Sequence, residues 1–273
     1  TLWKALVTGL RDYCRKTNQT KLVLGLSGGI DSALSAAIAV EAVGAVNVIG
    51  VAMPSRYSSD HSVTDAKKLA ANLSIELREI PIDTVHKAFE SSLHFSDLAG
   101  ENLQARIRAV LLMGISNTDN ALLLSTGNKS EIAVGYSTMY GDSAGGFAPI
   151  KDLFKSDVWR VSSWLNNRGN GELIPENSIT KEPSAELRPD QIDTDSLPNY
   201  KILDQVLALL IEQSATIEQV IASGHSRQLA EKIEGMVRAS EWKRSQGAIG
   251  TKTTAIAFGF GRRVPITTRF TEL

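Results

Sequence analysis

The sequence lacks cysteine pairs, a charge surplus of either sign and long apolar runs. Its 273 residues contain one cysteine, Cys14, which excludes an internal disulfide and a cysteine-rich zinc site. We therefore expect the cytoplasm as its compartment. The formal net charge of −1 argues against a protein that holds nucleic acid by bulk electrostatics. The most apolar stretch, residues 33–53, is interrupted by Glu41, Gly44 and Gly50, so we expect no membrane span.

Short apolar runs alternate with helical patterns through the first half of the chain. The run KLVLGL is followed by glycines, which is typical of a buried parallel strand. The predicted strands are residues 21–26, 47–53, 75–82 and 121–125, and the predicted helices are residues 2–15, 32–43, 62–73, 85–93 and 100–116. This alternation predicts an α/β fold with a doubly wound parallel sheet, whose ligands bind beyond the carboxyl ends of the strands.

The second half of the chain has a different character. Helical patterns cover residues 153–166, 200–213 and 216–240, with a break near Gly224. Residues 180–198 contain three prolines, many carboxylates and few large apolar side chains, which predicts an irregular, mobile loop. We consider two hypotheses for this loop, a lid that keeps water from a reactive intermediate or a disordered connection.

The clearest functional motif is GLSGGIDSA, which ends the first predicted strand and starts a helix. Gly28 and Gly29 let the backbone turn tightly and present amide groups to an anion at the positive end of a helix. Ser27 and Ser32 add hydroxyl donors. Asp31 would repel a phosphate on its own, so it fits the motif as a ligand of Mg²⁺ held between the carboxylate and phosphates.

A plainer interpretation makes the motif a glycine-rich turn whose Asp and Ser cap the following helix. Two glycines, an aspartate and two serines between a buried strand and a buried helix favour nucleotide binding instead. The motif has neither the GxxxxGK[ST] pattern of a Walker A loop nor the GxGxxG dinucleotide fingerprint.

The motif resembles the pyrophosphate-binding loop of the N-type ATP pyrophosphatases, which cleave ATP between the α- and β-phosphates and adenylate an acceptor oxygen. Further blocks of the chain resemble the NAD synthetases within that group. These blocks are MPSRYSSDHS (53–62), ENLQARIR (101–108), STGNKSEIAVGYSTMYGD (125–142), TKEPSAELRPDQ (180–191), DSLPNYKILD (195–204), EWKRSQ (241–246) and VPITTRF (264–270). The resemblance runs from about Tyr13 to Phe270, nearly the whole chain.

The resemblance implies a fold of the Rossmann-like adenine-nucleotide alpha-hydrolase type with extra C-terminal helices. It implies one NAD synthetase domain over residues 1–273, with an ATP pyrophosphatase core at about 18–160 and a lid loop and helices at about 161–273. The implied reaction is the ATP-dependent amidation of deamido-NAD to NAD through an acyl adenylate, with release of AMP and pyrophosphate.

Residue roles follow from the same resemblance. Asp31 and Glu131 would hold Mg²⁺ on the phosphates of ATP, Lys155 would neutralise the leaving pyrophosphate, and Asp142 would lie near the centre of amidation. The residues expected to contact ATP are Gly25, Leu26, Ser27, Gly28, Gly29, Ile30, Asp31, Ser32, Thr126, Lys155 and Ser184. The residues expected to contact deamido-NAD are Asn102, Arg106, Glu131, Tyr136, Ser137, Thr138, Met139 and Lys243.

Two of these expectations have an alternative within the sequence. Arg106 and Arg108 lie two apart on a predicted helix and point in different directions, and we expect Arg106 to contact the substrate. Lys243 resembles a substrate contact, although EWKR at a helix end could equally be a solvated charge cluster. Cys14, in an amphipathic helix, is expected to be a small core residue.

The chain differs from the short, ammonia-using NAD synthetases in two places. Met139 stands where those proteins carry Lys, and residues 180–200 form a longer segment than theirs. Both features resemble the synthetase half of the glutamine-dependent members, which carry an N-terminal amidase with a catalytic Cys-Glu-Lys set. This chain has no room for such a domain, so ammonia is the expected nucleophile, fed in the native setting by an absent amidase domain or subunit. Family members are homodimers, and we expect a homodimer here.

Two other functions stay open at this point. One is a different amidase or ligase of the N-type ATP pyrophosphatase group, and the other is a non-catalytic adenine-nucleotide-binding module. The histidines do not discriminate, because they show no metal-ligand spacing and are expected at surface or capping positions. They are His61, His86, His94 and His225.

Overall fold

A computed structural model of the chain describes residues 1–169, 171–259 and 261–267. At its centre lies a sheet of parallel strands in the order β3-β2-β1-β4. The strands are β1 (Lys21–Gly25), β2 (Val48–Ala52), β3 (Glu76–Glu79) and β4 (Ala121–Leu123). The predicted α/β fold with a parallel sheet is confirmed, and the strand order changes direction between β1 and β4, where open sheets of this kind bind ligands.

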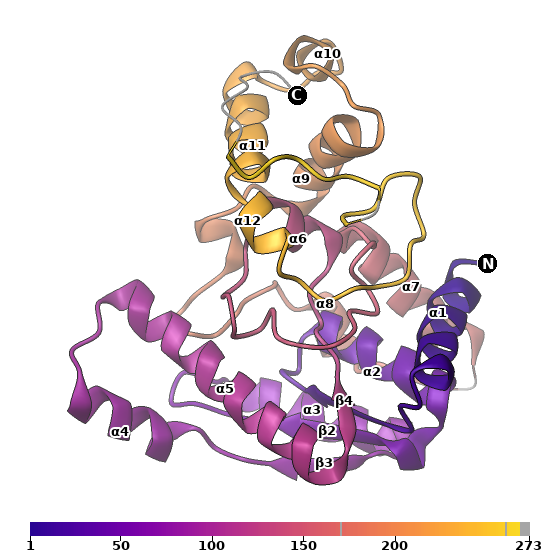
Figure 1. Cartoon of the computed structure of the whole chain (residues 1–273), viewed down its shortest axis with the longest axis vertical. Coiled ribbons are helices and arrows are strands. Elements are labelled where there is room, and N and C mark those ends of the chain that lie inside the picture. The colour runs from indigo at the N-terminus through magenta and orange to yellow at the C-terminus, as the bar shows by residue number, and fades with distance from the viewer. Residues whose placement is uncertain (170, 260, 268–273) are drawn as a thin grey trace.

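Helices flank the sheet and extend beyond it. They are α1 (Leu2–Lys16), α2 (Ile30–Val43), α3 (Asp60–Leu73), α4 (Asp83–Ser92), α5 (Asp97–Asp119), α6 (Lys129–Val134), α7 (Lys155–Arg168), α8 (Glu176–Thr180), α9 (Tyr200–Leu207), α10 (Ile217–Ala222), α11 (Arg227–Ala239) and α12 (Glu241–Arg244). Short helical turns are η1 (Ala45–Asn47), η2 (Asp193–Asp195) and the π-helical η3 (Ala208–Glu212). In Figure 1 the sheet lies in the lower half and α6 and α9 to α12 lie above it.

Both faces of the sheet are covered, which explains why the three central residues of β1 are all apolar and buried. Leu22 and Leu24 belong to the cluster formed with α1, α2, α3 and α7, whereas Val23 between them belongs to the cluster formed with α5. Successive side chains of a strand point to opposite faces, so α5 lies on the other side of the sheet from α2 and α3 (Figure 1). Each fully buried leucine stabilises the fold by about 1.5–3 kcal/mol.

A second apolar cluster fills the upper part of the molecule in Figure 1. It contains Leu203 of α9 and Ile233 of α11, and α6 joins it through Ala133. The later helix α7 returns to the first cluster through Val158. The chain therefore passes from the second cluster at α6 to the first at α7 and back to the second at α9.

A buried ion cluster fixes the start of α6. The Lys129 side chain is fully buried, and its ammonium lies 2.9 Å from Asp152 Oδ1, 2.7 Å from Glu212 Oε1 and 2.8 Å from Thr254 Oγ1. Removing one partner from such a cluster costs about 3–5 kcal/mol, because a charge is left buried without compensation. The cluster sets the position of Glu131, two residues further along α6.

Local expectations hold with changes at the ends of elements. The strand predicted over residues 75–82 is shorter, since β3 stops before Pro81, which has no N–H to donate. The break near Gly224 is confirmed, with φ of +98° at this glycine between α10 and α11. Cys14 is buried in α1, as expected. The predicted VPITTRF block is only partly described, because residues 268–270 lie outside the described ranges.

The expectation that all histidines are surface or capping residues is wrong for His86. Its side chain is the buried one of the amphipathic helix α4 and is only 3% exposed. The sequence gives no sign of this, because the burial depends on how the inner face of α4 meets the rest of the molecule. His61 and His94 are exposed, as expected, and His225 is half-buried.

Residues 181–198, called the strap below, are irregular apart from η2, as predicted. The Glu186 carboxylate holds the strap against α3, since it accepts hydrogen bonds from Ser59 Oγ (2.9 Å) and Ser62 Oγ (2.7 Å). On the other side, the Gln104 amide of α5 donates to Leu187 O at 2.8 Å. The strap therefore spans from α3 to α5 across the carboxyl edge of the sheet.

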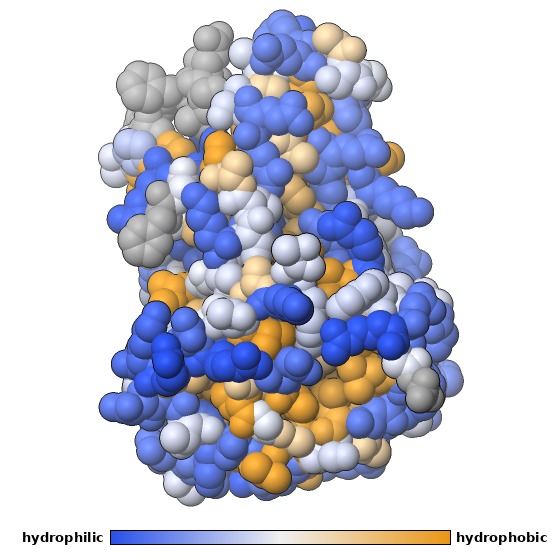
Figure 2. Space-filling view, turned by 90° about the vertical axis from the view of Figure 1, so that its right-hand side faces the viewer, coloured by the Kyte–Doolittle hydropathy of each residue, from blue (hydrophilic) through white to orange (hydrophobic). Residues whose placement is uncertain are grey.

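One face of the molecule is mostly hydrophilic. Figure 2 shows the face that carries α1, where hydrophilic side chains predominate and apolar ones gather in the lower part. Among the described residues, no helix combines the length and apolarity needed to cross a membrane.

Candidate active site

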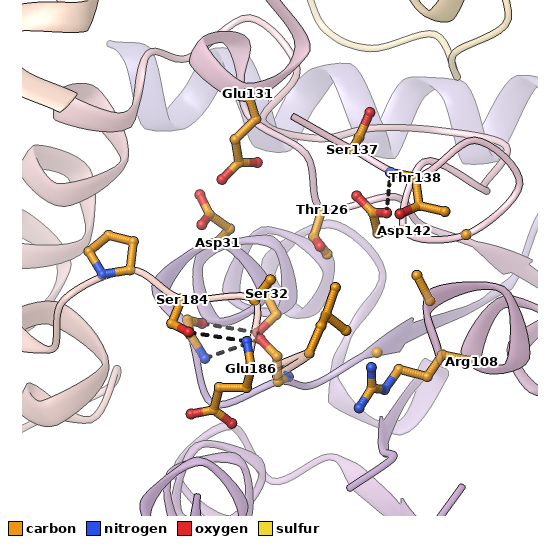
Figure 3. A pocket seen from close by; sticks show the side chains of 18 of the residues that line it. Asp31, Ser32, Arg108, Thr126, Glu131, Ser137, Thr138, Asp142, Ser184 and Glu186 are labelled. Carbon is orange, nitrogen blue, oxygen red and sulfur yellow. Dashed lines mark hydrogen bonds between the residues drawn. The ribbon is translucent and has the colours of Figure 1, made fainter. Parts of the chain in front are cut away.

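The carboxyl edge of the sheet opens into a cavity of about 690 Å³. Its lining comes from the GLSGGIDSA loop after β1, the segments after β2 and β4, one side of α5, and the strap. The expected site residues that line it are Gly25, Leu26, Ser27, Gly29, Ile30, Asp31, Ser32, Asn102, Thr126, Glu131, Tyr136, Ser137, Thr138, Asp142, Lys155, Ser184 and Lys243. Figure 3 shows several of them, with Asp31 and Glu131 on one side of Thr126 and Asp142 on the other.

Three expected site residues do not line this cavity. Gly28 is the part of the loop that packs against Ser62 of α3, and Met139 is buried beside a neighbouring cavity of about 40 Å³. Arg106 is exposed, and its Nε donates to Met139 O at 3.2 Å. Arg108 lines the large cavity instead, with its Nε donating to Met53 O at 3.0 Å, and burial lowers the pKa of Arg108 to about 10. The structure thus brings the other arginine of the pair to the cavity, while the role of Arg106 remains a prediction.

Gly28 is required by close packing of the loop on α3. Its φ is +79°, and a Cβ atom at this position would lie 2.4 Å from the carbonyl oxygen of Ser62. The carbonyl oxygen of Gly28 accepts a hydrogen bond from Ser178 Oγ at 2.8 Å. Both the conformation and the space exclude a side chain here.

We expect Gly28→Ala to destabilise the protein and to abolish ATP binding. The left-handed backbone conformation alone costs about 1–3 kcal/mol for alanine, and the clash with Ser62 adds to it. Gly29→Ala is the matched control, since Gly29 has φ of −84° and an added Cβ would meet only the Ser27 hydroxyl at 3.2 Å. Urea unfolding of both variants measures the difference. Equal stability of the two variants would contradict the packing argument.

The serines of the loop hold its turn at the start of α2. The Ser27 N–H donates to Ser32 Oγ (3.3 Å), the Ser32 hydroxyl donates to Gly29 O (3.0 Å), and the Gly29 N–H donates to Ser27 Oγ (3.2 Å). Helix α2 starts immediately after Gly29, so its positive end faces the cavity. This arrangement can bind the phosphates of a nucleotide.

Two carboxylates and one ammonium meet above this loop. Figure 3 shows the carboxylates of Asp31 and Glu131 pointing toward each other. Lys155 is only 2% exposed, and its ammonium donates a short hydrogen bond to Asp31 Oδ2 and lies 3.5 Å from Glu131 Oε1. Asn128 caps α6 by accepting the Glu131 N–H at 3.0 Å, and its amide donates to Asp31 Oδ1 at 2.9 Å. One asparagine therefore positions both carboxylates.

Burial and the neighbouring charges shift the pKa values of this cluster. Burial, together with the negative charge of Asp31, raises the pKa of Glu131 to about 8. Burial alone would lower the pKa of Lys155, but the charges of Asp31 and Glu131 outweigh it and raise that pKa. Lys155 is thus held as a cation. Glu131 favours its protonated form, because its carboxylate would be charged in a desolvated position.

The donor set fits Mg²⁺ only in company with phosphate oxygens. Two carboxylates from separate elements are the usual protein contribution to a magnesium site, in which substrate phosphates and water complete the shell. Among the described residues no group of three or more His, Cys, Asp or Glu side chains could hold a metal by itself. Asp31 and Glu131 are accordingly the residues that would hold the ion.

The raised pKa of Glu131 predicts a pH dependence of stability. The folded protein favours protonated Glu131, so the free energy of unfolding falls as pH rises between about 4.5 and 8. The slope from this group reaches at most about 1.4 kcal/mol per pH unit. Glu131→Gln removes this pH dependence. The free energy of unfolding of the variant, relative to that of the wild type, should therefore increase as pH rises to 8. A constant difference in urea unfolding from pH 5 to pH 9 would refute the assignment.

The wall opposite the carboxylates is a tight turn after α6. The Thr138 N–H donates to Asp142 Oδ1 at 2.7 Å, as the dashed line in Figure 3 marks, and Thr138 Oγ1 donates to Asn102 Oδ1 at 2.6 Å. Burial raises the pKa of Asp142. Lys243 braces the turn by donating to Gly135 O and to Ser137 O, each at 2.7 Å.

The EWKR segment is not a solvated charge cluster. Glu241 and Arg244 are buried and paired at 2.8 Å. Arg244 also donates to the carbonyl oxygen of Ala133 at 2.5 Å. Helix α12 therefore fixes the wall of the cavity against α6, with Lys243 facing the cavity.

Several charged residues line the cavity although the sequence assigned them no contact. They include Arg108 and, in the strap, Glu186 and Asp193. Both are acidic residues in a loop, and nothing in such a sequence distinguishes a buried carboxylate from the solvated ones around it. The only indication in the sequence is that residues 180–198 contain many acidic side chains.

Comparisons with known proteins place this arrangement in a family. The sequence profile of the NAD synthase family matches residues 2–247. A glutamine-dependent NAD(+) synthetase of Thermotoga maritima is 50% identical over 277 residues, which cover 99% of this chain and 48% of that protein. The chain thus spans about half the length of the curated relatives it matches.

Solved structures agree with the sequence relatives. An NH3-dependent NAD synthetase from Campylobacter jejuni superposes with a TM-score of 0.73 at 29% identity, covering 89% of this chain and 94% of that one. An NMN synthetase from Francisella tularensis superposes with a TM-score of 0.76 at 27% identity, covering 98% of both chains. The fold, the loop after β1 and the family profile lead to the same assignment, and the chain belongs to the NAD synthase family.

Proposed function

We propose that this chain catalyses the ATP-dependent amidation of deamido-NAD to NAD, with ammonia as the nucleophile. The observation that carries the proposal is that one cavity joins the phosphate loop, the cluster of Asp31, Glu131 and Lys155, and the wall at Asp142. Family membership and the names of the relatives support it.

The first step forms an acyl adenylate. The nicotinate carboxylate oxygen attacks the α-phosphorus of ATP, the bond from that phosphorus to the bridging oxygen breaks, and pyrophosphate leaves. The loop amides and Lys155 stabilise the charge on the departing group, which is worth several kcal/mol when donors are preorganised. Mg²⁺ bound by Asp31 and Glu131 would add positive charge at the phosphates.

The second step forms the amide. Ammonia attacks the carbonyl carbon, the bond from that carbon to the phosphate oxygen of AMP breaks, and the nitrogen loses a proton. Thr138 and Asp142 lie on the wall where the nicotinate ring would rest, so the protein contributes mainly by positioning. The strap covers the cavity and excludes water from the adenylate.

Partners and compartment belong to the same proposal. We propose a homodimer, because α4 and α5 at the lower left of Figure 1 expose apolar side chains, with Leu98 67% and Val110 72% exposed. Glutamine-dependent relatives of twice the length suggest an amidase domain or subunit as the ammonia source. The cytoplasm is the proposed compartment, on the basis of the lone buried cysteine.

An assay with ATP, Mg²⁺ and deamido-NAD tests the function, run with ammonium, with glutamine and with neither. NAD, AMP and pyrophosphate are followed together. We expect NAD with ammonium only, and AMP in equal amount. No NAD with ammonium would overturn the proposal, and ATP binding without turnover would favour a nucleotide-binding module.

The similarity to an NMN synthetase supports a second candidate, the amidation of nicotinate mononucleotide. The same assay with that mononucleotide in place of deamido-NAD compares the two acceptors. A higher kcat/KM for the mononucleotide would transfer the proposal to the shorter substrate.

A further inference from the structure

Asp193 is a buried carboxylate of the strap. It lies outside the sequence motifs named above and has no role in the proposed reaction. It is 5% exposed and lines the cavity. Its backbone N–H donates to Pro183 O at 2.9 Å, which closes the strap into a loop. Both of its carboxylate oxygens accept hydrogen bonds from tyrosines on other elements, from Tyr200 at 2.9 Å and from Tyr136 at 3.2 Å.

Tyr200 forms part of the surroundings of Lys155. The Lys155 ammonium lies 5.2 Å from the centroid of the Tyr200 ring and 5.9 Å from that of Trp159. The two rings pack edge to face with centroids 6.0 Å apart. A hydrogen bond that orients Tyr200 therefore also orients the aromatic surface against which Lys155 rests.

Tyr136 belongs to the opposite side of the site. It follows Gly135, the residue that ends α6 with φ of +70°, and lines the cavity immediately before Ser137 and Thr138. Asp193 thus contacts both the surroundings of Lys155 and the wall at which the acceptor ring would rest.

The burial of Asp193 is costly and calls for a reason beyond packing. Desolvation raises the pKa of Asp193, while the tyrosine hydroxyls and the charge of Lys155 act in the other direction. An apolar residue of similar size would fill the same space without this cost. What distinguishes the carboxylate is that two hydroxyls from separate elements converge on it.

We propose that Asp193 is a positioning residue that links closure of the strap to the alignment of Lys155 and Tyr136. The inference deepens the proposed function and rests on it for its catalytic consequences. When the strap is closed, Asp193 fixes both tyrosines, and with them the two ends of the site between which the carboxylate and ATP react. When the strap opens, both hydrogen bonds break together.

Asp193→Asn tests the inference, because it keeps the size of the side chain and removes its charge and one acceptor. We expect kcat for NAD formation to fall by about tenfold or more, and KM for deamido-NAD to rise, with KM for ATP changed less than about threefold. Tyr200→Phe should lower kcat alone, and Tyr136→Phe should raise KM for deamido-NAD alone. Asp190→Asn, an exposed charge on the same strap, is the matched control and should match the wild type. Wild-type kcat and KM values for Asp193→Asn would overturn the proposal.

Amide hydrogen exchange without substrates keeps the inference separate from the proposed function. We expect faster exchange over residues 181–198 and 134–138 in Asp193→Asn, at an unchanged thermal midpoint, and no change in Asp190→Asn. Exchange that is unchanged in Asp193→Asn would overturn the link even in an active enzyme. A wild type that forms no NAD counts against the proposed function alone, because the exchange result stands without it.

Discussion

Asparagine in place of Asp31 should slow ATP-dependent pyrophosphate release by about 30- to 1,000-fold, a loss of roughly 2–4 kcal/mol of transition-state stabilisation. The substitution keeps the size of the side chain and an oxygen that can accept from Asn128. It removes the negative charge that binds Lys155 and that would hold Mg²⁺. Lys155 stays paired with Glu131, 3.5 Å away, so we expect the protein to fold.

The measurement is the single-turnover rate of pyrophosphate release at several concentrations of Mg²⁺. We expect the loss to be partly recovered at high Mg²⁺, because the remaining carboxylate binds the ion more weakly. Asp12→Asn is the control, since Asp12 is a surface carboxylate of α1 paired only with Arg15 and Lys16 in the described structure. A wild-type rate for Asp31→Asn would remove the metal role from Asp31.

Methionine in place of Lys155 should produce the other large effect. The substitution leaves the Asp31 and Glu131 carboxylates close together and without their cation. We expect the free energy of unfolding to fall by about 3 kcal/mol, the lower end of the range for breaking a buried pair, because Glu131 already favours its protonated form. Pyrophosphate release should slow by about 10²- to 10³-fold, since the departing charge loses its fixed partner.

A double-mutant cycle separates these two effects. Asp31→Asn combined with Lys155→Met removes both charges of the pair, so it should recover most of the lost stability. It should recover none of the pyrophosphate release, which needs both groups. Recovery of activity in the double variant would show that Lys155 serves only to neutralise Asp31.

The half-length match to glutamine-dependent relatives bears on how the site is supplied with nitrogen. The similar NH3-dependent synthetase from Campylobacter jejuni has nearly the same length as this chain. We therefore expect ammonium to support NAD formation in the assay without a further domain.

Features that depend on neighbouring residues could be predicted from the sequence. The apolar run of β1 and the glycines after it specify a buried strand and a tight turn, because strand burial and backbone freedom are local properties of these residues. Gly28 is the clearest case, since glycine adopts its φ of +79° without the steric cost that a side chain would add. The resemblance then named Asp31, Glu131 and Lys155, which one cavity indeed brings together.

Features that depend on which surfaces meet were decided by the tertiary structure. Arg106 and Arg108 differ by two positions on one helix, and the packing of α5 on the sheet directs Arg108 to the cavity. His86 and Asp193 look like surface residues in the sequence, yet both are buried in the fold. The sequence by itself determined the phosphate loop and the family, because those depend on short local patterns. Only the fold decided which charges are buried and paired, because burial is a property of contacts between distant segments.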